Sequence, residues 1–158
     1  MSQRDARYQG AIVRDHSLLL IKHRYFDDGH SYWLLPGGGR EPGETEEHAV
    51  RREMQEETGL EVRVERLLFE EPAEGEGGLY RRYKTYLCTP IGGQAQPGHE
   101  PEHDAAEAYA ISEVRWFDLR DPSSWDPQVI PDPYTYPQML RIREELGYTE
   151  GHREGTEA

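Results

Sequence analysis

Three glutamates at helical spacing are the residues of this sequence best suited to chemistry. Glu53, Glu56 and Glu57 stand at positions i, i+3 and i+4, so their carboxylates would share one face of a helix. Like charges crowded on one face destabilise a helix unless a positive charge lies among them. Hard divalent cations such as Mg²⁺ take oxygen ligands of this kind. A divalent metal ion is therefore the natural partner of this face.

The helix that would carry these glutamates has clear ends and a clear buried side. Thr45 can accept a hydrogen bond from a free backbone N–H of the first turn, and Gly59 provides a C-terminal stop. Val50 and Met54 are four residues apart and are predicted to anchor the helix to the core. Ala49 lies among the glutamates, where its small side chain leaves room for a ligand.

An arginine and a glycine run flank the same face. Arg52 precedes Glu56 by four residues, but an exposed salt bridge at this spacing adds only about 0.2–0.5 kcal/mol. We therefore expect Arg52 to orient a carboxylate beside the metal. Upstream, Pro36 ends an apolar segment and is followed by glycines 37–39, whose backbone can approach a ligand closely.

Hydrophobic patterning predicts the elements that position this helix. A short polar turn at 15–17 between two apolar runs predicts a hairpin. Alternation in the segment after the helix places Leu60, Val62, Val64 and Leu67 on one buried face. The predicted strands span residues 8–14, 18–25, 32–35, 60–69, 79–89 and 111–119, and a C-terminal helix spans residues 134–146.

Length and composition indicate one soluble domain. The chain has 158 residues and a net charge of −13, which argues against binding nucleic acid through its phosphates and against binding an anionic membrane. No apolar run approaches a membrane span, and the N-terminus lacks a signal-peptide core, so a cytoplasmic protein is expected. Cys88 lies in a strand-like run and is expected to be a buried core thiol. We assign residues 1–148 to a single domain and residues 149–158 to a disordered tail.

A basic cluster stands out in this acidic chain. Arg81, Arg82 and Lys84 lie on one predicted strand, where they could form a clamp for a phosphate or a carboxylate. The alternative is a solvated strand face that balances nearby acids. Several aromatic residues could likewise stack on a base or simply pack in the protein. These aromatic residues are Tyr25, Tyr32, Trp33, Tyr80 and Tyr83.

The segment from Gly38 to Leu60 resembles the complete signature of the Nudix hydrolases. Gly38 is followed after five residues by Glu44, and after seven more by the run that begins at Arg52 and ends at Leu60. Every fixed position of the signature is filled, and Met54 and Leu60 occupy its two aliphatic positions. The predicted order of strands and helices also resembles the family over residues 9–147.

This resemblance implies an α/β/α sandwich around a mixed β-sheet, and hydrolysis of a nucleoside diphosphate linked to another group, with Mg²⁺ or Mn²⁺. Arg52 would orient the carboxylates, and Glu44 would support the site. The backbone of Gly38 and Gly39 would lie close to the substrate. The metal ligands would be Glu53, Glu56 and Glu57.

The general base and the substrate stay open at this point. Glu53 or a glutamate outside the helix could accept the proton of the attacking water. Many relatives carry an acid where this chain has Ala110, so Glu107 or Glu113 could substitute, although each could equally be a surface residue. The expected partner is a small nucleotide, and a homodimer is allowed. Our alternative function is a catalytically weak nucleotide-binding or regulatory module on the same fold.

Overall fold

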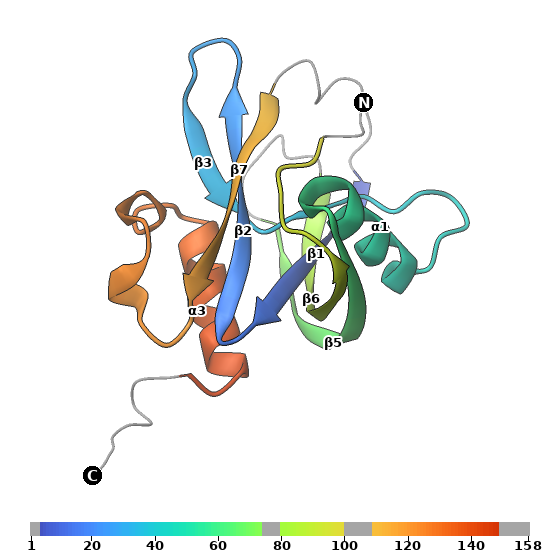
Figure 1. The fold of residues 1–158 in the computed structure, drawn as a ribbon. Coiled ribbons are helices and arrows are strands. Elements are labelled where there is room, and N and C mark those ends of the chain that lie inside the picture. Colours follow the sequence, from blue (N-terminus) through green and yellow to red (C-terminus); the bar gives the residue numbers. More distant parts are fainter. Residues whose placement is uncertain (1–3, 74–79, 100–108, 149–158) are drawn as a thin grey trace.

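A mixed seven-stranded sheet forms the centre of the computed structural model, which describes residues 4–73, 80–99 and 109–148 (Figure 1). The strands run in the order β3-β2-β1-β6-β5, with β4 paired to β1 and β7 paired to β2. The β1–β6 pair is parallel, and the other pairs are antiparallel. The strands are β1 (Arg4–Arg14), β2 (Ser17–Tyr25), β3 (Ser31–Leu34), β4 (Gly37–Gly38), β5 (Leu60–Pro72), β6 (Tyr80–Gly93) and β7 (Tyr109–Asp118). The helices are α1 (Glu46–Thr58) and α3 (Thr135–Glu145), with 3-10 turns at Pro122–Ser124 and Pro127–Val129.

Helices α1 and α3 cover opposite faces of the sheet, which confirms the predicted α/β/α sandwich. Side chains alternate between the faces along each strand, so neighbouring residues of β2 enter different cores. Leu19 packs in one core with Val50 of α1, whereas Leu20 packs in the other core with Met139 and Ile142 of α3. The sheet is therefore buried on both sides, and α1 is fixed against one of them.

Helix α1 forms as its sequence predicted. The Thr45 hydroxyl accepts a hydrogen bond from the His48 backbone N–H, and Gly59 ends the helix in the left-handed region at φ 76°. Val50 and Met54 are fully buried. The chain after β6 returns to the end of α1, where the backbone N–H of Gly98 donates to the Glu57 carbonyl. Both ends of the helix are therefore tied down, which fixes the direction in which its glutamates point.

Strand β5 corrects one prediction. Leu67 was expected on the buried face, but it is exposed, and Leu68 and Phe69 are buried instead. The β5–β6 register shifts between Glu61 and Val62, between Val64 and Arg66, and between Leu67 and Phe69. A bulge adds a residue to one strand and so reverses the face of every side chain beyond it. Simple alternation therefore fails after Val64.

Strands β1 and β2 stay together only near their turn. Asp15 and His16 both adopt positive φ, as a tight hairpin turn requires, and the strands pair at Val13–Leu18 and Arg14–Ser17. Away from the turn, β1 pairs with β4 and β6, while β2 pairs with β3 and β7. The sheet consequently opens between β1 and β2. The predicted tail at 149–158 lies outside the described residues.

Candidate active site

The glycine loop touches the carboxylates of α1. Strand β4 pairs with β1, and the Gly37 backbone N–H donates a hydrogen bond of 2.9 Å to Glu57 Oε1. A Cβ atom on Gly38 would lie 2.3 Å from Glu53 Oε2, so a larger residue at 38 would displace that carboxylate. The loop therefore approaches the glutamates as closely as the absence of a side chain allows.

Arg52 is the centre of a carboxylate network. Its Nε and Nη2 atoms donate to the two Glu44 oxygens at 2.6 and 2.9 Å, and its Nη1 donates to Glu53 Oε2 at 3.1 Å and to Glu56 Oε1 at 3.2 Å. Its Nη2 also donates to the Gly39 carbonyl at 3.0 Å. The hydrogen bonds from Arg52 lower the pKa of Glu44 to about 2. Arg52 thus joins the loop to the helix and holds three carboxylates in place.

The carboxylates of this site fit a hard divalent cation. Glu53 and Glu57 are 3% and 1% exposed, whereas Glu56 is partly open to solvent. Carboxylates crowded out of water are costly unless positive charge compensates them. Carboxylate oxygens are the ligand type that Mg²⁺ prefers. Glu53, Glu56 and Glu57 would hold such an ion.

The basic residues of β6 have acidic partners. Lys84 Nζ donates to both oxygens of Glu46 at 3.0 and 3.2 Å, and Arg82 lies 2.5 Å from Glu70. Arg81 is exposed. This pairing matches the alternative of a strand face that balances nearby acids. A substrate-binding role for Arg81, Arg82 and Lys84 stays a prediction.

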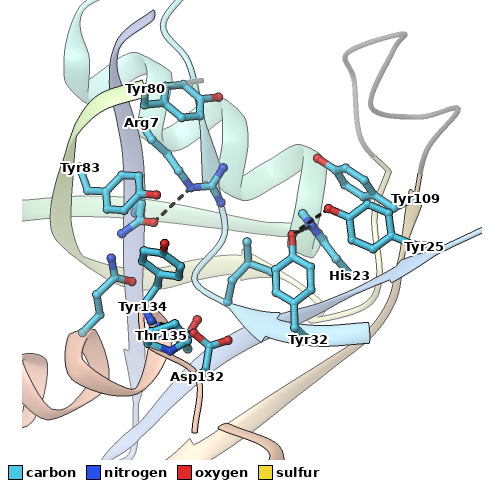
Figure 2. A pocket seen from close by; sticks show the side chains of 14 residues that line it. Arg7, His23, Tyr25, Tyr32, Tyr80, Tyr83, Tyr109, Asp132, Tyr134 and Thr135 are labelled. Atoms are coloured by element: carbon cyan, nitrogen blue, oxygen red, sulfur yellow. Dashed lines mark hydrogen bonds between the residues drawn. The ribbon is translucent and has the colours of Figure 1, made fainter. Parts of the chain in front are cut away.

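A cavity of about 620 Å³ opens where β1 and β2 separate (Figure 2). We call it the tyrosine pocket, because six tyrosines line it. Strands β3, β6 and β7 and the start of α3 also contribute to its wall. Trp33, one of the aromatic residues considered for stacking or packing, packs in the core at 1% exposure. The tyrosines of the pocket are Tyr25, Tyr32, Tyr80, Tyr83, Tyr109 and Tyr134.

Arg7 also lines this pocket, and sequence reasoning missed it. Its Nε donates to Gln9 Oε1 at 3.1 Å, and its Nη2 donates to the Leu35 carbonyl at 2.9 Å. Burial alone would lower the pKa of Arg7, but the negative charges of nearby groups, including Glu57 and Glu53, raise it, so Arg7 stays charged. Arg7 therefore belongs to the pocket wall and is hydrogen-bonded to the segment that leads into the glycine loop.

His23 forms a buried neutral part of the pocket wall. Its ring stacks on Tyr109 with centroids 4.2 Å apart, and its Nδ1 lies 3.3 Å from the Tyr32 hydroxyl. Burial, followed by the charge of Arg7, lowers the pKa of His23 to about 3. Among the described residues, its Nε2 has no hydrogen-bond partner.

The buried His23 should make the protein sensitive to mild acid. Its pKa is about 3 when folded and 6.5 ordinarily, so the unfolded chain binds the proton more tightly. The contribution of neutral His23 to the free energy of unfolding is fully present above pH 6.5. It is lost as pH falls towards 3, at up to about 1.4 kcal/mol per pH unit. We expect His23→Leu to flatten the fall in melting temperature between pH 6.5 and 5. His99→Leu, at an exposed histidine, should leave the slope unchanged, and an equally steep slope in His23→Leu would refute the assignment.

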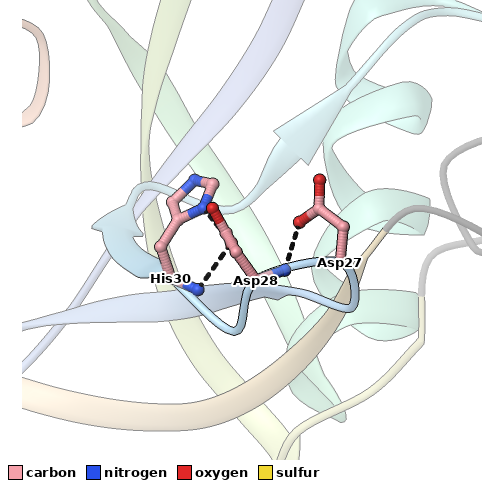
Figure 3. Close-up of side chains that lie close together, drawn as sticks. All are labelled: Asp27, Asp28 and His30. Carbon is pink, nitrogen blue, oxygen red and sulfur yellow. Dashed lines mark hydrogen bonds and ion pairs between the residues drawn. The ribbon is translucent and has the colours of Figure 1, made fainter.

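A group of side chains that could bind a metal ion lies in the β2–β3 loop (Figure 3). One ligand atom from each of Asp27, Asp28 and His30 lies within 4.8 Å of the others, and all three residues are exposed. Hydrogen bonds within the loop account for the arrangement, since Asp28 Oδ1 accepts from the His30 backbone N–H at 2.9 Å. His30 also stacks on Tyr25.

Glu107 and Glu113 were considered as substitutes for the acid that many relatives carry at the position of Ala110. Glu113 lies on β7, where Arg115 Nη2 donates to it at 2.7 Å and Lys22 lies 3.8 Å away. Those two cations also lie over the Trp33 ring, which belongs to the α3 side of the sheet. Glu107 lies outside the described residues.

The model of the NUDIX domain family matches residues 5–137. The chain belongs to the Nudix family. The match spans the glycine loop, α1 and most of the strands. Nudix proteins generally use a divalent metal ion. Within the described part of the chain, no helix is long and apolar enough to cross a membrane.

Relatives and solved structures agree with this family. The chain is 36% identical over 114 residues to an ADP-ribose pyrophosphatase of Methanocaldococcus jannaschii, a match covering 71% of this chain and 60% of the relative. A MutT Nudix hydrolase structure from Burkholderia pseudomallei is 29% identical, with a TM-score of 0.61 over 92% of this chain and 99% of that one. A UDP-X diphosphatase structure, 23% identical with a TM-score of 0.65, covers all of this chain and 68% of its own, and shows the fold alone. The matches span 22 to 60% of the lengths of the first curated relatives.

Proposed function

We propose that this protein is a Mg²⁺-dependent hydrolase that cleaves the diphosphate linkage of a nucleoside diphosphate joined to another group. The observation that carries the proposal is the carboxylate network in which Arg52 holds Glu44, Glu53 and Glu56 beside the glycine loop. Arg7 lines the tyrosine pocket, and its hydrogen bond to the Leu35 carbonyl ties it to the segment that leads into the glycine loop of this network. A diphosphate could therefore reach the carboxylate site while an attached base or sugar enters the pocket.

Each residue of the site has its own proposed role. Glu53, Glu56 and Glu57 would hold the ion, and Mn²⁺ could replace Mg²⁺ there. When bound, the metal neutralises diphosphate charge and lowers the pKa of a bound water. Arg52 fixes the carboxylates through its hydrogen bonds, and Glu44 anchors Arg52 in turn. A carboxylate of the site takes a proton from water, and Glu53 is our candidate for this role.

The pocket suits a planar group. Aromatic rings stack on bases of any sequence, and the pocket offers six tyrosines. The similar M. jannaschii protein is described as an ADP-ribose pyrophosphatase. A nucleotide derivative such as a nucleoside diphosphate sugar is therefore the substrate class we propose. We keep the cytoplasm as the expected compartment, and a homodimer as an allowed assembly.

A substrate panel tests this function. We expect turnover of at least one member among nucleoside triphosphates, sugar nucleotides, ADP-ribose and dinucleotide polyphosphates in the presence of Mg²⁺. Release of phosphorylated products, followed by chromatography, should stop on addition of EDTA and resume with excess Mg²⁺. An absence of turnover with every member would reject the enzyme and favour a nucleotide-binding or regulatory module.

A further inference from the structure

Arg7 carries a positive charge that the described residues leave without an ion-pair partner. It is half-buried in the wall of the tyrosine pocket (Figure 2). Within residues 4–73, 80–99 and 109–148, no carboxylate lies within 4.0 Å of its guanidinium. Its two hydrogen bonds go to an amide oxygen and a carbonyl, both neutral. Charges removed from water are normally paired, so an unpaired guanidinium in a pocket indicates a site for an anion.

The remaining donors of Arg7 are available to a ligand. A guanidinium offers five N–H groups, and the hydrogen bonds to Gln9 and to the Leu35 carbonyl use two of them. The planar fork of donors matches the oxygens of a phosphate and binds them in pairs. Among the described residues lining the pocket, Arg7 is the one lysine or arginine, and His23 is neutral. An anionic ligand group would therefore be drawn to Arg7.

The position of Arg7 indicates which anionic group of a ligand it would bind. Arg7 is followed in the chain by Tyr8, which pairs with Gly38 of the glycine loop. Its Nη2 donates to the Leu35 carbonyl, two residues before Gly37, and the Gly37 N–H donates to Glu57 Oε1, so Arg7 is tied to the segment that contacts the carboxylates of α1. Tyr80 and Tyr83 of the pocket lie beside Arg7 (Figure 2). A group bound by Arg7 would thus join a ring among the tyrosines to a linkage at the carboxylates.

We propose that Arg7 binds the phosphate of the nucleoside monophosphate moiety of the substrate, with the base among the tyrosines of the pocket. The identity of this ligand rests on the proposed function. Arg7 is then a substrate-binding residue that fixes which phosphate faces the carboxylates of α1. It supplies a fixed positive charge in the wall of the pocket.

A purely structural role for Arg7 makes a different prediction. Its hydrogen bond to the Leu35 carbonyl ties β1 to the segment before β4, so removing it could loosen the glycine loop. Such loosening would weaken the binding of nucleosides and nucleotides alike. A phosphate contact, in contrast, affects nucleotides and leaves nucleosides nearly unchanged. The ratio of the two affinities separates the roles.

Calorimetry without metal measures this ratio. In EDTA, the four nucleoside 5′-monophosphates and their nucleosides are titrated into the wild type, Arg7→Met, Arg7→Lys and Arg14→Met. Arg14 is the matched control, because it lies on the same strand at the far end and stacks on Trp116. We expect the wild type to bind the preferred monophosphate about tenfold or more tightly than its nucleoside, as a charge-assisted hydrogen bond allows.

The variants should differ in how strongly they prefer the monophosphate over its nucleoside. The preference for phosphate should fall to about threefold or less in Arg7→Met, be intermediate in Arg7→Lys, and stay at the wild-type value in Arg14→Met. Nucleoside binding by each variant reports whether its pocket is intact, and Arg7→Lys keeps the test valid if Arg7→Met does not fold. A wild-type ratio in both Arg7 variants would overturn the inference. Equal affinity of the wild type for nucleotide and nucleoside, or binding of neither, would also overturn it.

This experiment is independent of the test of function. Turnover of the substrate panel with Mg²⁺, together with no phosphate preference at Arg7, would reject the Arg7 site and keep the proposed enzyme. A clear phosphate preference that depends on Arg7, without any turnover, would reject the enzyme and keep the site. The two failures therefore give different results.

Discussion

Glu57→Gln is expected to reduce turnover by about a hundredfold or more while the protein stays folded, because it removes a negative ligand from the proposed metal site. Glutamine has nearly the same shape, and its amide oxygen can still accept the hydrogen bond that the Gly37 N–H gives to Glu57 Oε1. The local structure should thus survive. The lost charge should weaken metal binding, so the Mg²⁺ concentration for half-maximal activity should rise.

Glu56→Gln should also reduce turnover while the protein stays folded. Glu56 Oε1 accepts a hydrogen bond from Arg52 and is more exposed than Glu57, so its loss should disturb folding even less. The matched control is Glu47→Gln, an exposed glutamate in the first turn of the same helix, which should keep wild-type turnover. Steady-state kinetics over a range of Mg²⁺ concentrations, with melting curves for each variant, provide the measurement. Turnover close to wild type in both Glu56→Gln and Glu57→Gln would disprove the metal-site assignment.

Local sequence was sufficient to predict α1. The cap at Thr45, the stop at Gly59 and the buried Val50 and Met54 depend on residues within a few turns of one another. The same holds for the spacing of the glutamates on one face. The sequence also predicted that Arg52 contacts carboxylates of the site. Its two hydrogen bonds to Glu44 were not predicted, because they depend on how the loop folds back.

The pocket could not be predicted because it depends on pairing between distant strands. Arg7 lies in a polar N-terminal segment, and pairing with β6 and β4 brings it beside Tyr83 and the glycine loop. Nothing in its neighbouring residues marks it. Bulges have the same effect on Leu67, since a register shift is decided by the partner strand. The pairing of Lys84 with Glu46 likewise depends on how α1 packs over β6.

Gly38→Ala is expected to lower turnover by about a hundredfold with little loss of stability. The added Cβ would lie 2.3 Å from Oε2, 2.5 Å from Cδ and 2.8 Å from Oε1 of Glu53. These atoms form the end of a flexible side chain, so the carboxylate can turn away while the backbone stays in place. The displaced Glu53 would leave its hydrogen bond with Arg52 and its proposed place at the metal. A shift of about 1 Å at a reacting group is enough for such a loss of rate.

The neighbouring Gly37 gives the opposite expectation and so serves as the control. A Cβ on Gly37 would lie 2.5 Å from the Tyr8 carbonyl oxygen and 2.9 Å from the Gln9 Cα, which are backbone atoms of β1 and cannot turn aside. Gly37→Ala should therefore destabilise the fold by about 1–3 kcal/mol, as overpacking does. Denaturant unfolding and kinetics on both variants separate the two effects. If Gly38→Ala instead kept wild-type kinetics, the position of Glu53 against the glycine loop would have no part in the reaction, because its side chain cannot stay there once a methyl group occupies the space.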